Sequence, residues 1–366
     1  MHMRMRTAVG IATVGRPAVL AETLRELGRQ TRLPDRIVVC GTSPEDVGDV
    51  SAWAQPAEVV LAPRGLPCQR NRILEVTADC DILLFLDDDF LPDPHYIENV
   101  EQIFLERPDV AMATGRVLAD GIGGPGLTPA EGRAILAADD FAGDRLQTVP
   151  AFNGYGCNMA VRSAVVRRHR LRFDERLPLY AWQEDVDFSR RLAPHGAILQ
   201  VEGARGVHLG VKHGRSPGVQ LGYAQVVNPL YLVRKQAGYP MGRALSHVGC
   251  NMAANLLRAL RPEPWVDRRG RLRGNLQALA DLLRGRLEPE RMLACAAPGR
   301  RSERPPIPAA AHNPSWRQAG PALAPRQVPL ALDAHADTEP LAALSPALGA
   351  AMLAGSTGSI PDQGVP

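Results

Sequence analysis

Three adjacent carboxylates, Asp87, Asp88 and Asp89, follow the apolar run ILLFL at residues 82–86. Two like charges about 4 Å apart repel by roughly 4 kcal/mol at an effective dielectric constant near 20, so either a carboxylate takes up a proton or a cation binds. Hard carboxylate oxygens favour Mg²⁺ or Mn²⁺. On a strand end, Asp87 and Asp89 can point the same way while Asp88 points elsewhere. The pattern predicts a divalent-metal site at Asp87 and Asp89, with a solvated turn or a helix cap as the alternative.

A second acidic group lies in WQEDVDFSRRL, residues 182–192, where Glu184, Asp185 and Asp187 come close to the start of an expected helix. The helix macrodipole favours negative charge at that end. Taken alone, the group therefore fits ordinary helix-start acidity, with Asp187 paired to Arg190 or Arg191. A catalytic carboxylate is the other interpretation.

Alternating strand and helix patterns position these groups. Short apolar runs predict strands at 7–14, 36–40, 58–63, 81–87 and 110–118. Helical spacing after Pro17 and at 67–78 and 93–107 predicts the helices between them. This alternation predicts an α/β fold with a mostly parallel sheet that is flanked by helices. Ligands of such sheets bind beyond the carboxyl ends of the strands, where Asp87–Asp89 lie.

The rest of the chain is expected to extend this unit. The stretch 119–150 is interpreted as an irregular insertion, 152–163 as a Gly-punctuated loop that leads into a strand, 183–195 as a helix and 197–210 as one or two strands. Further helices are expected at 220–237, 242–260 and 272–285. From residue 296 onward the composition becomes rich in Pro, Ala, Gly and Ser, which predicts a disordered tail. The expected division is therefore 1–215, a helical C-terminal extension at 216–295, and a tail at 296–366.

Two of the expected C-terminal helices interleave leucine with arginine. The arginines concerned are Arg258, Arg261, Arg273, Arg284 and Arg286. This pattern fits a packed helix pair with solvated arginines, and it also fits an amphipathic face that lies on a membrane surface.

Composition narrows the function classes. The net charge of +3 does not indicate a nucleic-acid partner, and none is expected. The six cysteines contain no CxxC pair, so we expect reduced thiols in a cytoplasmic protein. The apolar run near the N-terminus is too short for a signal peptide, and the uncharged run 340–361 is interrupted by prolines. We therefore expect a cytoplasmic protein, and peripheral contact with the inner membrane face is a further option.

The order of these segments resembles the family 2 glycosyltransferases, which have the GT-A fold. The resemblance runs from about Thr7 to His213, and arguably to Leu287. It is carried, in order, by IATVGRPAVLAETLREL, PDRIVV, GLPCQRN, LLFLDDDF, GYGCNMAVR, FDERLPLYAWQEDVDFSRRL and GVHLG.

The resemblance implies a role for each matching residue. Thr13 and Arg16 correspond to the loop that holds the nucleotide, and Arg70 and Asn71 to an RN pair that contacts base or phosphate. Asp87 and Asp89 form the D-x-D motif, in which Asp89 is the direct metal ligand and Asp87 also serves the nucleotide. Of the later pair Glu184 and Asp185, Asp185 corresponds to the general base. His208, or failing that His213, corresponds to a histidine of the metal shell.

The resemblance therefore implies a metal-dependent, inverting transfer of sugar from a nucleotide-sugar donor to a saccharide or lipid-linked acceptor, with Mg²⁺ or Mn²⁺ as cofactor. One departure concerns the nucleobase. Many relatives carry an Asp after the second strand, whereas this chain has Cys40 and Gly41, followed by Thr42 and Ser43 as substitutes. The identity of the nucleobase is left open.

Three other functions are compatible with parts of this pattern. A haloacid-dehalogenase-type phosphatase also places D-x-D after a strand, but it normally has Thr or Val two residues later, where this chain has Leu91. A sugar-phosphate nucleotidyltransferase needs a GxGTR-type loop after the first strand, and ATVGRP does not match it. A non-catalytic nucleotide-sugar or glycan-binding protein on the same fold remains an alternative that only activity can separate.

Overall fold

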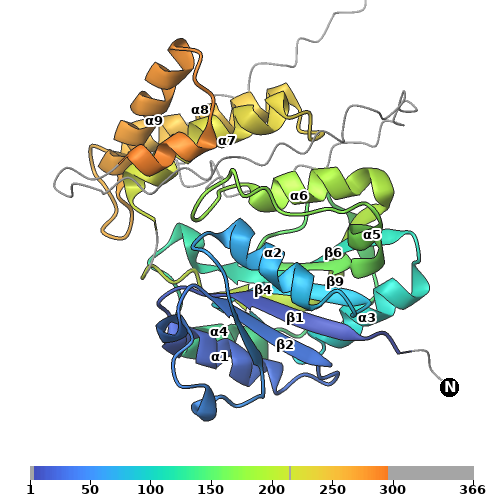
Figure 1. Cartoon of the computed structure of the whole chain (residues 1–366). Coiled ribbons are helices and arrows are strands. Elements are labelled where there is room, and N and C mark those ends of the chain that lie inside the picture. The colour runs from blue at the N-terminus through green and yellow to red at the C-terminus, as the bar shows by residue number, and fades with distance from the viewer. Residues whose placement is uncertain (1–3, 214–215, 296–366) are drawn as a thin grey trace, which may run out of the picture. The chain divides into compact units, whose positions relative to one another are not determined.

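The computed structural model describes residues 4–213 and 216–295 (Figure 1). Within these residues a nine-stranded sheet has the order β3-β2-β1-β4-β8-β6-β9-β5, and β7 pairs with β9. Its strands are β1 Thr7–Ala12, β2 Arg36–Gly41, β3 Glu58–Leu61, β4 Ile82–Asp87, β5 Phe90–Pro92, β6 Val110–Asp120, β7 Thr148–Pro150, β8 Asn158–Arg162 and β9 Ala197–His208. Only β5, β7 and β8 run against the others. The predicted α/β fold with a mostly parallel sheet is confirmed.

Helices alternate with the strands and then follow them. They are α1 Pro17–Leu27, α2 Leu66–Val76, α3 Tyr96–Glu106, α4 Pro129–Ala137, α5 Ser163–Arg168, α6 Glu184–Leu192, α7 Gly218–Arg234, α8 Met241–Arg258 and α9 Arg268–Leu283. Short 3-10 turns occur at Pro44–Asp46, Val50–Ala52, Gly121–Gly123, Ala193–His195 and Pro289–Ala294. Pro17 occupies the first turn of α1, where its missing N–H costs nothing.

The two faces of the sheet are covered by different helices. On one face, Leu84 and Leu86 of β4 pack with leucines of α1 and with the aromatic side chains of α3. On the other face, Leu83 and Phe85 of β4 pack with residues of α2, α5 and α6. Figure 1 shows the sheet between these two layers. The continuous apolar run in β4 is explained because both of its faces are buried.

Strand register gathers polar residues at one edge of the sheet. Ala12 of β1 lies opposite Asp87 of β4 in a parallel pair. His208 of β9 lies opposite Phe90 of β5 and opposite Asp120 of β6. The residues that follow β1 and β4 and those that end β6 and β9 therefore meet at the same edge.

The stretch 119–150 is more regular than predicted. It contains α4, which begins at a capping box in which Thr128 and Glu131 satisfy each other's backbone N–H groups, with Pro129 in the first turn. The T-P-x-E pattern of residues 128–131 signals this helix start, so the prediction of an irregular insertion is wrong at α4. The short strands β5 and β7 and the helix α5 were also not predicted, since three to six residues carry little periodicity.

The last three helices, α7, α8 and α9, pack against one another with polar residues between them. The Gln225 amide donates to Asn251 Oδ1 at 2.8 Å, and the Asn255 amide donates to Asn275 Oδ1 at 3.0 Å. Among the described residues, no helix has both the length and the apolar character needed to cross a bilayer. The predicted tail at 296–366 lies outside the described residues, and the expected division at 215 stays a prediction.

A buried arginine ties the end of α8 to the start of α9. Arg268, which is 2% exposed, donates to both carboxylate oxygens of Glu263 at 2.9 Å, and Arg258 adds a third bond at 2.8 Å. The hydrogen bonds from Arg268 lower the pKa of Glu263 from 4.5 to about 2. A carboxylate whose pKa is lowered by folding stabilises the protein above its ordinary pKa, and this stabilisation is lost as the pH falls through the folded value.

We therefore expect Glu263→Gln to lower the free energy of unfolding by about 2 kcal/mol at pH 7 and by clearly less at pH 3. Urea denaturation of the two proteins at both pH values measures this. Glu290→Gln is the matched control, since its partner Arg176 lies on the surface, and we expect it to cost less than about 1 kcal/mol. An equal loss for Glu263→Gln at both pH values would contradict the electrostatic explanation.

Candidate active site

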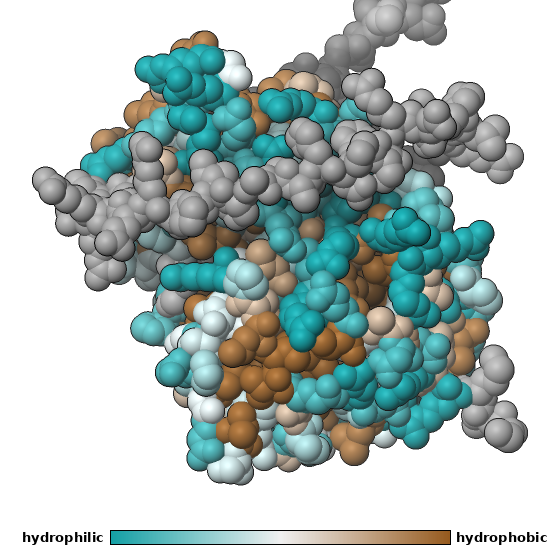
Figure 2. All heavy atoms as spheres, viewed as in Figure 1, coloured by the Kyte–Doolittle hydropathy of each residue, from teal (hydrophilic) through white to brown (hydrophobic). Residues whose placement is uncertain are grey.

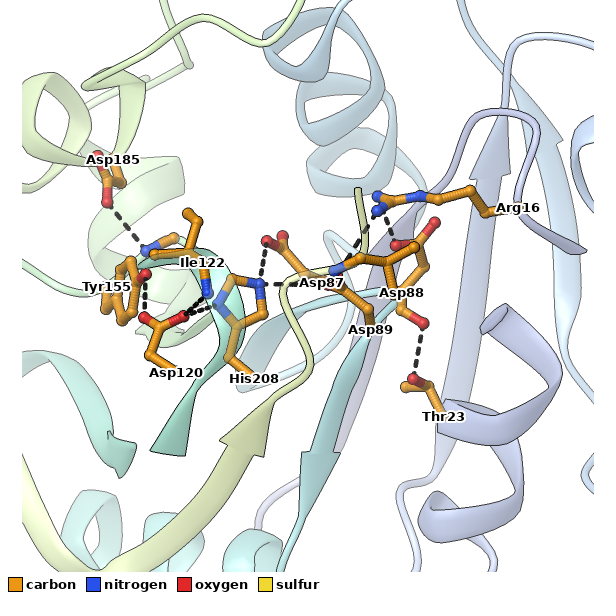
Figure 3. A network of polar contacts seen from close by, with 12 residues as sticks. Arg16, Thr23, Asp87, Asp88, Asp89, Asp120, Ile122, Tyr155, Asp185 and His208 are labelled. Carbon is orange, nitrogen blue, oxygen red and sulfur yellow. Dashed lines mark hydrogen bonds and ion pairs between the residues drawn. The ribbon is translucent and has the colours of Figure 1, made fainter. Parts of the chain in front are cut away.

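Three side chains at the carboxyl edge of the sheet are placed to hold one metal ion. A carboxylate oxygen of Asp87, one of Asp89 and a ring nitrogen of His208 all lie within 4.8 Å of one another. His208 Nε2 lies 3.3 Å from Asp89 Oδ1 and 4.0 Å from Asp87 Oδ2 (Figure 3). The structure thus brings together the three residues for which a metal role was predicted.

His208 is oriented by a second carboxylate behind it. Its Nδ1 lies 3.0 Å from Asp120 Oδ1, and Asp120 also accepts hydrogen bonds from Tyr155 Oη at 2.7 Å and from the Ile122 backbone N–H at 3.0 Å (Figure 3). A carboxylate that holds one ring nitrogen in this way presents the other to a metal. Asp120 and Tyr155 were not predicted, because their role depends on the register between β6 and β9.

The charge on this cluster is shared between Asp89 and His208. Burial alone would lower the pKa of His208, but the carboxylates of Asp89 and Asp120 raise it well above its usual value. Burial alone would raise the pKa of Asp89, but His208 holds it well below its usual range. Asp89 and His208 thus stabilise each other's charged form.

Asp88 points away from this cluster, as expected for the middle residue of the three. Its carboxylate accepts a hydrogen bond from Thr13 Oγ1 at 2.7 Å. The carboxylate also pairs with Arg16 at 2.6 Å (Figure 3). Its backbone oxygen accepts from Thr23 Oγ1 at 2.7 Å. Burial, assisted by the neighbouring Asp89, raises the pKa of Asp88 to about 7 although Arg16 opposes this. Asp88 thus fastens the loop after β1 to the end of β4.

Arg70 connects the two acidic groups of the sequence. Its buried guanidinium pairs with Glu184 at one nitrogen, and at the other it donates to Asp87 Oδ1 at 3.1 Å and to the Gly156 backbone oxygen at 2.6 Å. Phe85 and Phe173 lie 5.7 and 5.5 Å from its charge centre. The structure therefore places Arg70 between carboxylates, whereas its predicted contact with the nucleotide remains untested.

The backbone of the Gly-punctuated loop touches the second acidic pair. Asp185 Oδ2 accepts from the Gly156 N–H at 2.9 Å (Figure 3), and a Cβ on Gly156 would lie 3.3 Å from carboxylate oxygens of both Asp185 and Glu184. Burial raises the pKa of Glu184 to about 8 and also raises that of Asp185. One oxygen of Glu184 has no hydrogen-bond partner among the described residues. These features suit a carboxylate that accepts a proton.

Two other predicted residues have partners within the protein. Thr13 is buried and donates to Asp88, and its backbone oxygen accepts from the Gln69 amide at 3.0 Å. Asn71 is buried and exchanges hydrogen bonds with the Phe173 backbone at 3.0 and 2.8 Å. Neither arrangement was visible in the sequence, and the predicted nucleotide contacts of Thr13 and Asn71 stay predictions.

A carboxylate after β2 was also missed. Asp46 accepts hydrogen bonds from the backbone of Gly15 at 2.7 Å and of Thr42 at 2.8 Å, and the Thr42 hydroxyl donates to it at 2.6 Å. It joins the loops that follow β1 and β2. The sequence signal was the S-P-E-D turn, whose capping box places Asp46 at the third position of a 3-10 turn.

The segment before Glu184 is held in an unusual backbone conformation. Leu179, Ala181 and Gln183 have φ angles of 59°, 54° and 71°, which non-glycine residues rarely adopt. The Asn228 amide of α7 donates to the Trp182 backbone oxygen at 2.7 Å, and the Gln183 amide contacts His247 Nδ1 of α8 at 2.7 Å. Trp182 is buried among residues of α7, so it belongs to the core. The C-terminal helices therefore position the segment that carries Glu184 and Asp185.

The donor set fits a divalent cation. The carboxylates of Asp87, Asp89, Asp120 and Glu184 pair with three cations, Arg16, Arg70 and His208. The cluster combines two carboxylates with one imidazole that is oriented from behind, and such oxygen-rich sets suit Mg²⁺ or Mn²⁺. Which of the two binds is not decided by these ligands.

Comparison with known protein families identifies the chain. A family model described as "Glycosyltransferase like family 2" matches residues 5–204, more than half of the chain. The chain belongs to this glycosyltransferase family. The match covers the sheet, both acidic groups and most of β9, and it confirms the resemblance found in the sequence.

Solved structures similar to this family 2 glycosyltransferase include TarS of S. aureus, with 15% identity, a TM-score of 0.43, and coverage of 61% of this chain and 40% of that one. A second is the mannosyltransferase PcManGT from Pyrobaculum calidifontis in complex with GDP-Man and Mn²⁺, with 15% identity, a TM-score of 0.46, and coverage of 80% of this chain and 79% of that one. A third is glucosyl-3-phosphoglycerate synthase from Mycobacterium tuberculosis in complex with Mn²⁺, UDP and phosphoglyceric acid, with 18% identity, a TM-score of 0.43, and coverage of 64% of this chain and 80% of that one. The chain thus spans less than half the length of TarS. No curated protein sequence matches it. Similarity at this level does not identify a substrate.

Metal binding at Asp87, Asp89 and His208 is expected to release a proton. Because the pKa of His208 lies well above its usual value, its Nε2 is protonated at pH 7 and must lose that proton before it can bind Mn²⁺. Affinity should therefore rise with pH. Calorimetric titration with Mn²⁺ in buffers of different ionisation enthalpy should show about one proton released per ion at pH 7.

His208→Gln should bind Mn²⁺ more weakly and release no proton, and Asp89→Asn should remove most of the binding. His195→Gln, which changes a histidine outside the cluster, is the control and should release the same proton as the wild type. Proton-free binding by the wild type would show that the ion binds elsewhere.

Proposed function

We propose that this protein is a metal-dependent, inverting glycosyltransferase that moves a sugar from a nucleoside-diphosphate sugar to the hydroxyl of a saccharide or lipid-linked saccharide. The proposal includes a cytoplasmic location and a role in polysaccharide or glycoconjugate synthesis. One observation supports this proposal in addition to family membership. The cluster of Asp87, Asp89 and His208 is connected through Arg70 to the acidic pair Glu184 and Asp185, which supports a proposed diphosphate site next to a proposed base.

The reaction is a single displacement. The acceptor oxygen forms a bond to the anomeric carbon while the bond from that carbon to the diphosphate oxygen breaks, and the electron pair leaves with the nucleoside diphosphate. A bound Mg²⁺ or Mn²⁺ supplies neutralisation of the charge on that leaving group. Asp87, Asp89 and His208 are the residues that would hold it.

Asp185 is proposed to take the proton of the acceptor hydroxyl. The Gly156 N–H at 2.9 Å and the Val186 N–H at 2.8 Å fix its carboxylate, and burial raises its pKa toward the range in which a base works efficiently. Glu184, which directly precedes Asp185, is proposed to hold Arg70 in place and thereby to position Asp185. Burial raises the pKa of Glu184, and the paired Arg70 guanidinium opposes this rise.

Arg16 is the cation best placed to assist the diphosphate. It is 22% exposed, it pairs with Asp88, and it lies 3.6 Å from Asp89. The nucleobase stays open because Asp46 engages Thr42 and Ser43, the two residues proposed as substitutes for the missing aspartate.

Nucleotide binding tests the first half of the proposal. A thermal-shift screen of nucleoside diphosphates with and without Mn²⁺ should show one diphosphate that raises the melting temperature only when the metal is present. A ligand that binds the native state stabilises it by mass action, by about 2.7 kcal/mol at a hundred times its dissociation constant. Asp89→Asn should remove the metal-dependent part of the shift. Stabilisation that ignores both the metal and this variant would contradict the proposed diphosphate site.

Transfer itself tests the second half. Asp185→Asn should leave Mn²⁺-dependent nucleotide binding intact and reduce kcat by about 10²–10⁴-fold, because the side chain keeps its shape and loses its basicity. Product formation from the donor identified by the screen measures this. Asp93→Asn is the control and should retain wild-type activity. It makes the same chemical change at a carboxylate whose one hydrogen bond within the described residues comes from the His95 N–H.

Two outcomes would redirect the proposal. Full transfer activity in Asp185→Asn would show that another residue is the base. Tight nucleotide-sugar binding by the wild type without transfer to any acceptor would favour a binding protein on the same fold.

A further inference from the structure

Helix α8 carries its polar residues on its buried side. His247, Asn251 and Asn255 recur at intervals of four residues, so they share one face, and their exposed fractions are 9%, 8% and 1%. They contact Gln183 before α6, Gln225 of α7 and Asn275 of α9. An ordinary surface helix buries its apolar face, so this arrangement is inverted.

The opposite face of α8 is apolar and exposed. Its larger members are Met241, Leu245, Leu256 and Leu257, each 51–59% exposed, followed by Leu260 at 83%. Between Arg243 and Arg258 the helix has no charged residue, and Gly249 and Ala253 are among the small residues exposed between these leucines. Exposed apolar side chains that gather on one helix face are typical of interaction sites. We call Met241, Leu245, Leu256, Leu257 and Leu260 the α8 apolar face.

A tryptophan and several arginines follow α8 in the connection to α9 and in the first turns of α9. Trp265 is 39% exposed, and Arg261, Arg269 and Arg273 are exposed and form no ion pair with any residue that the structure describes. The Arg269 Nε donates to the Ala259 backbone oxygen at 3.3 Å, which places it against the end of α8. The acidic residues nearby have other partners, since Glu263 pairs with Arg268 and Asp267 caps α9.

The segment as a whole is strongly basic. Residues 216–295 contain twelve Lys and Arg residues against five Asp and Glu residues, whereas the whole chain has a net charge of only +3. In Figure 2, brown and teal surfaces lie side by side over the part of these helices that is in view. The partner of the α8 apolar face must therefore accept both apolar side chains and positive charge.

We propose that the α8 apolar face docks on a lipid bilayer that contains anionic headgroups. Leucine side chains would enter the boundary between headgroups and acyl chains, as in helices that lie in the plane of a membrane. Trp265 would sit at headgroup level, where tryptophan is enriched, and the arginines would meet the negative surface potential. A second copy of this chain is a poorer partner, because its own Arg261, Arg269 and Arg273 would repel those of the first.

The buried face of α8 connects the proposed docking surface to the candidate active site. His247 contacts Gln183, the residue directly before Glu184, so α8 lies between the docking surface and the segment that carries the acidic pair. If the proposed function holds, an acceptor held in the bilayer would reach the enzyme from the surface on which α8 docks.

Vesicle flotation tests the docking without any sugar nucleotide, so its result is independent of the transferase activity. The full chain should float with vesicles of phosphatidylcholine that contain about a third phosphatidylglycerol, and much less with phosphatidylcholine alone. The combined change of Leu256, Leu257 and Leu260 to Gln should reduce binding by at least tenfold, since each removes exposed apolar surface. Arg261→Gln should weaken binding to the anionic vesicles by roughly fivefold and leave the weak binding to neutral vesicles unchanged.

Leu33→Gln and Leu61→Gln are matched controls, since these leucines are 48% and 47% exposed on the sheet-bearing part of the chain, and they should bind like the wild type. Circular dichroism confirms that each variant is folded. The proposal is overturned if the wild type fails to float with anionic vesicles or if the triple leucine variant floats equally well. It is also overturned if sedimentation shows a wild-type dimer that the triple variant turns into a monomer, because the face would then join two copies.

Discussion

A buried guanidinium holds the two acidic groups of this protein in one site. Arg70 is 2% exposed, and it lies between Glu184 at the start of α6 and Asp87 at the end of β4, with the Gly156 backbone as a third partner. A buried charge is tolerated only when it is paired and hydrogen-bonded, so each of these carboxylates must stay near Arg70. The attraction thereby fixes where α6 meets the sheet, and with it where Asp185 faces the cluster of Asp87, Asp89 and His208.

The buried carboxylates of the site fall into two groups, according to whether their pKa is lowered or raised. Where a carboxylate has a rigid cation beside it, as Asp89 has His208, its pKa falls and it stays ionised. Where burial dominates, as at Asp88 and Glu184, the pKa rises to about 7 and about 8, and the ion pairs with Arg16 and Arg70 oppose this rise. Asp87, Asp89 and the oriented ring of His208 converge at one position, which is the candidate site for a divalent ion.

The C-terminal helices take part in the same construction. Their polar contacts, from Asn228 to the Trp182 backbone and from His247 to Gln183, stabilise a segment whose φ angles are costly for side chains with a Cβ. Because α8 uses its polar face for this inner role, its leucines are left on the outside. The inversion of α8 is thus a structural consequence of how the acidic segment is held, as well as the origin of the proposed docking surface.

Local pattern in the sequence was sufficient for the α/β fold, for the strand end at Asp87 and for the helix start at Glu184, because hydrophobic periodicity and turn residues act over short stretches. The order of the motifs was sufficient for the family. The partners of each side chain were not predictable, since Arg70, Asp120, Tyr155 and Asp46 acquire their roles only through strand register and burial. The leucines of α8 illustrate the limit most clearly. Their spacing revealed an amphipathic helix, but only the packing of α7, α8 and α9 decided which face is inside, because polar side chains can be buried when neighbouring helices satisfy their hydrogen bonds.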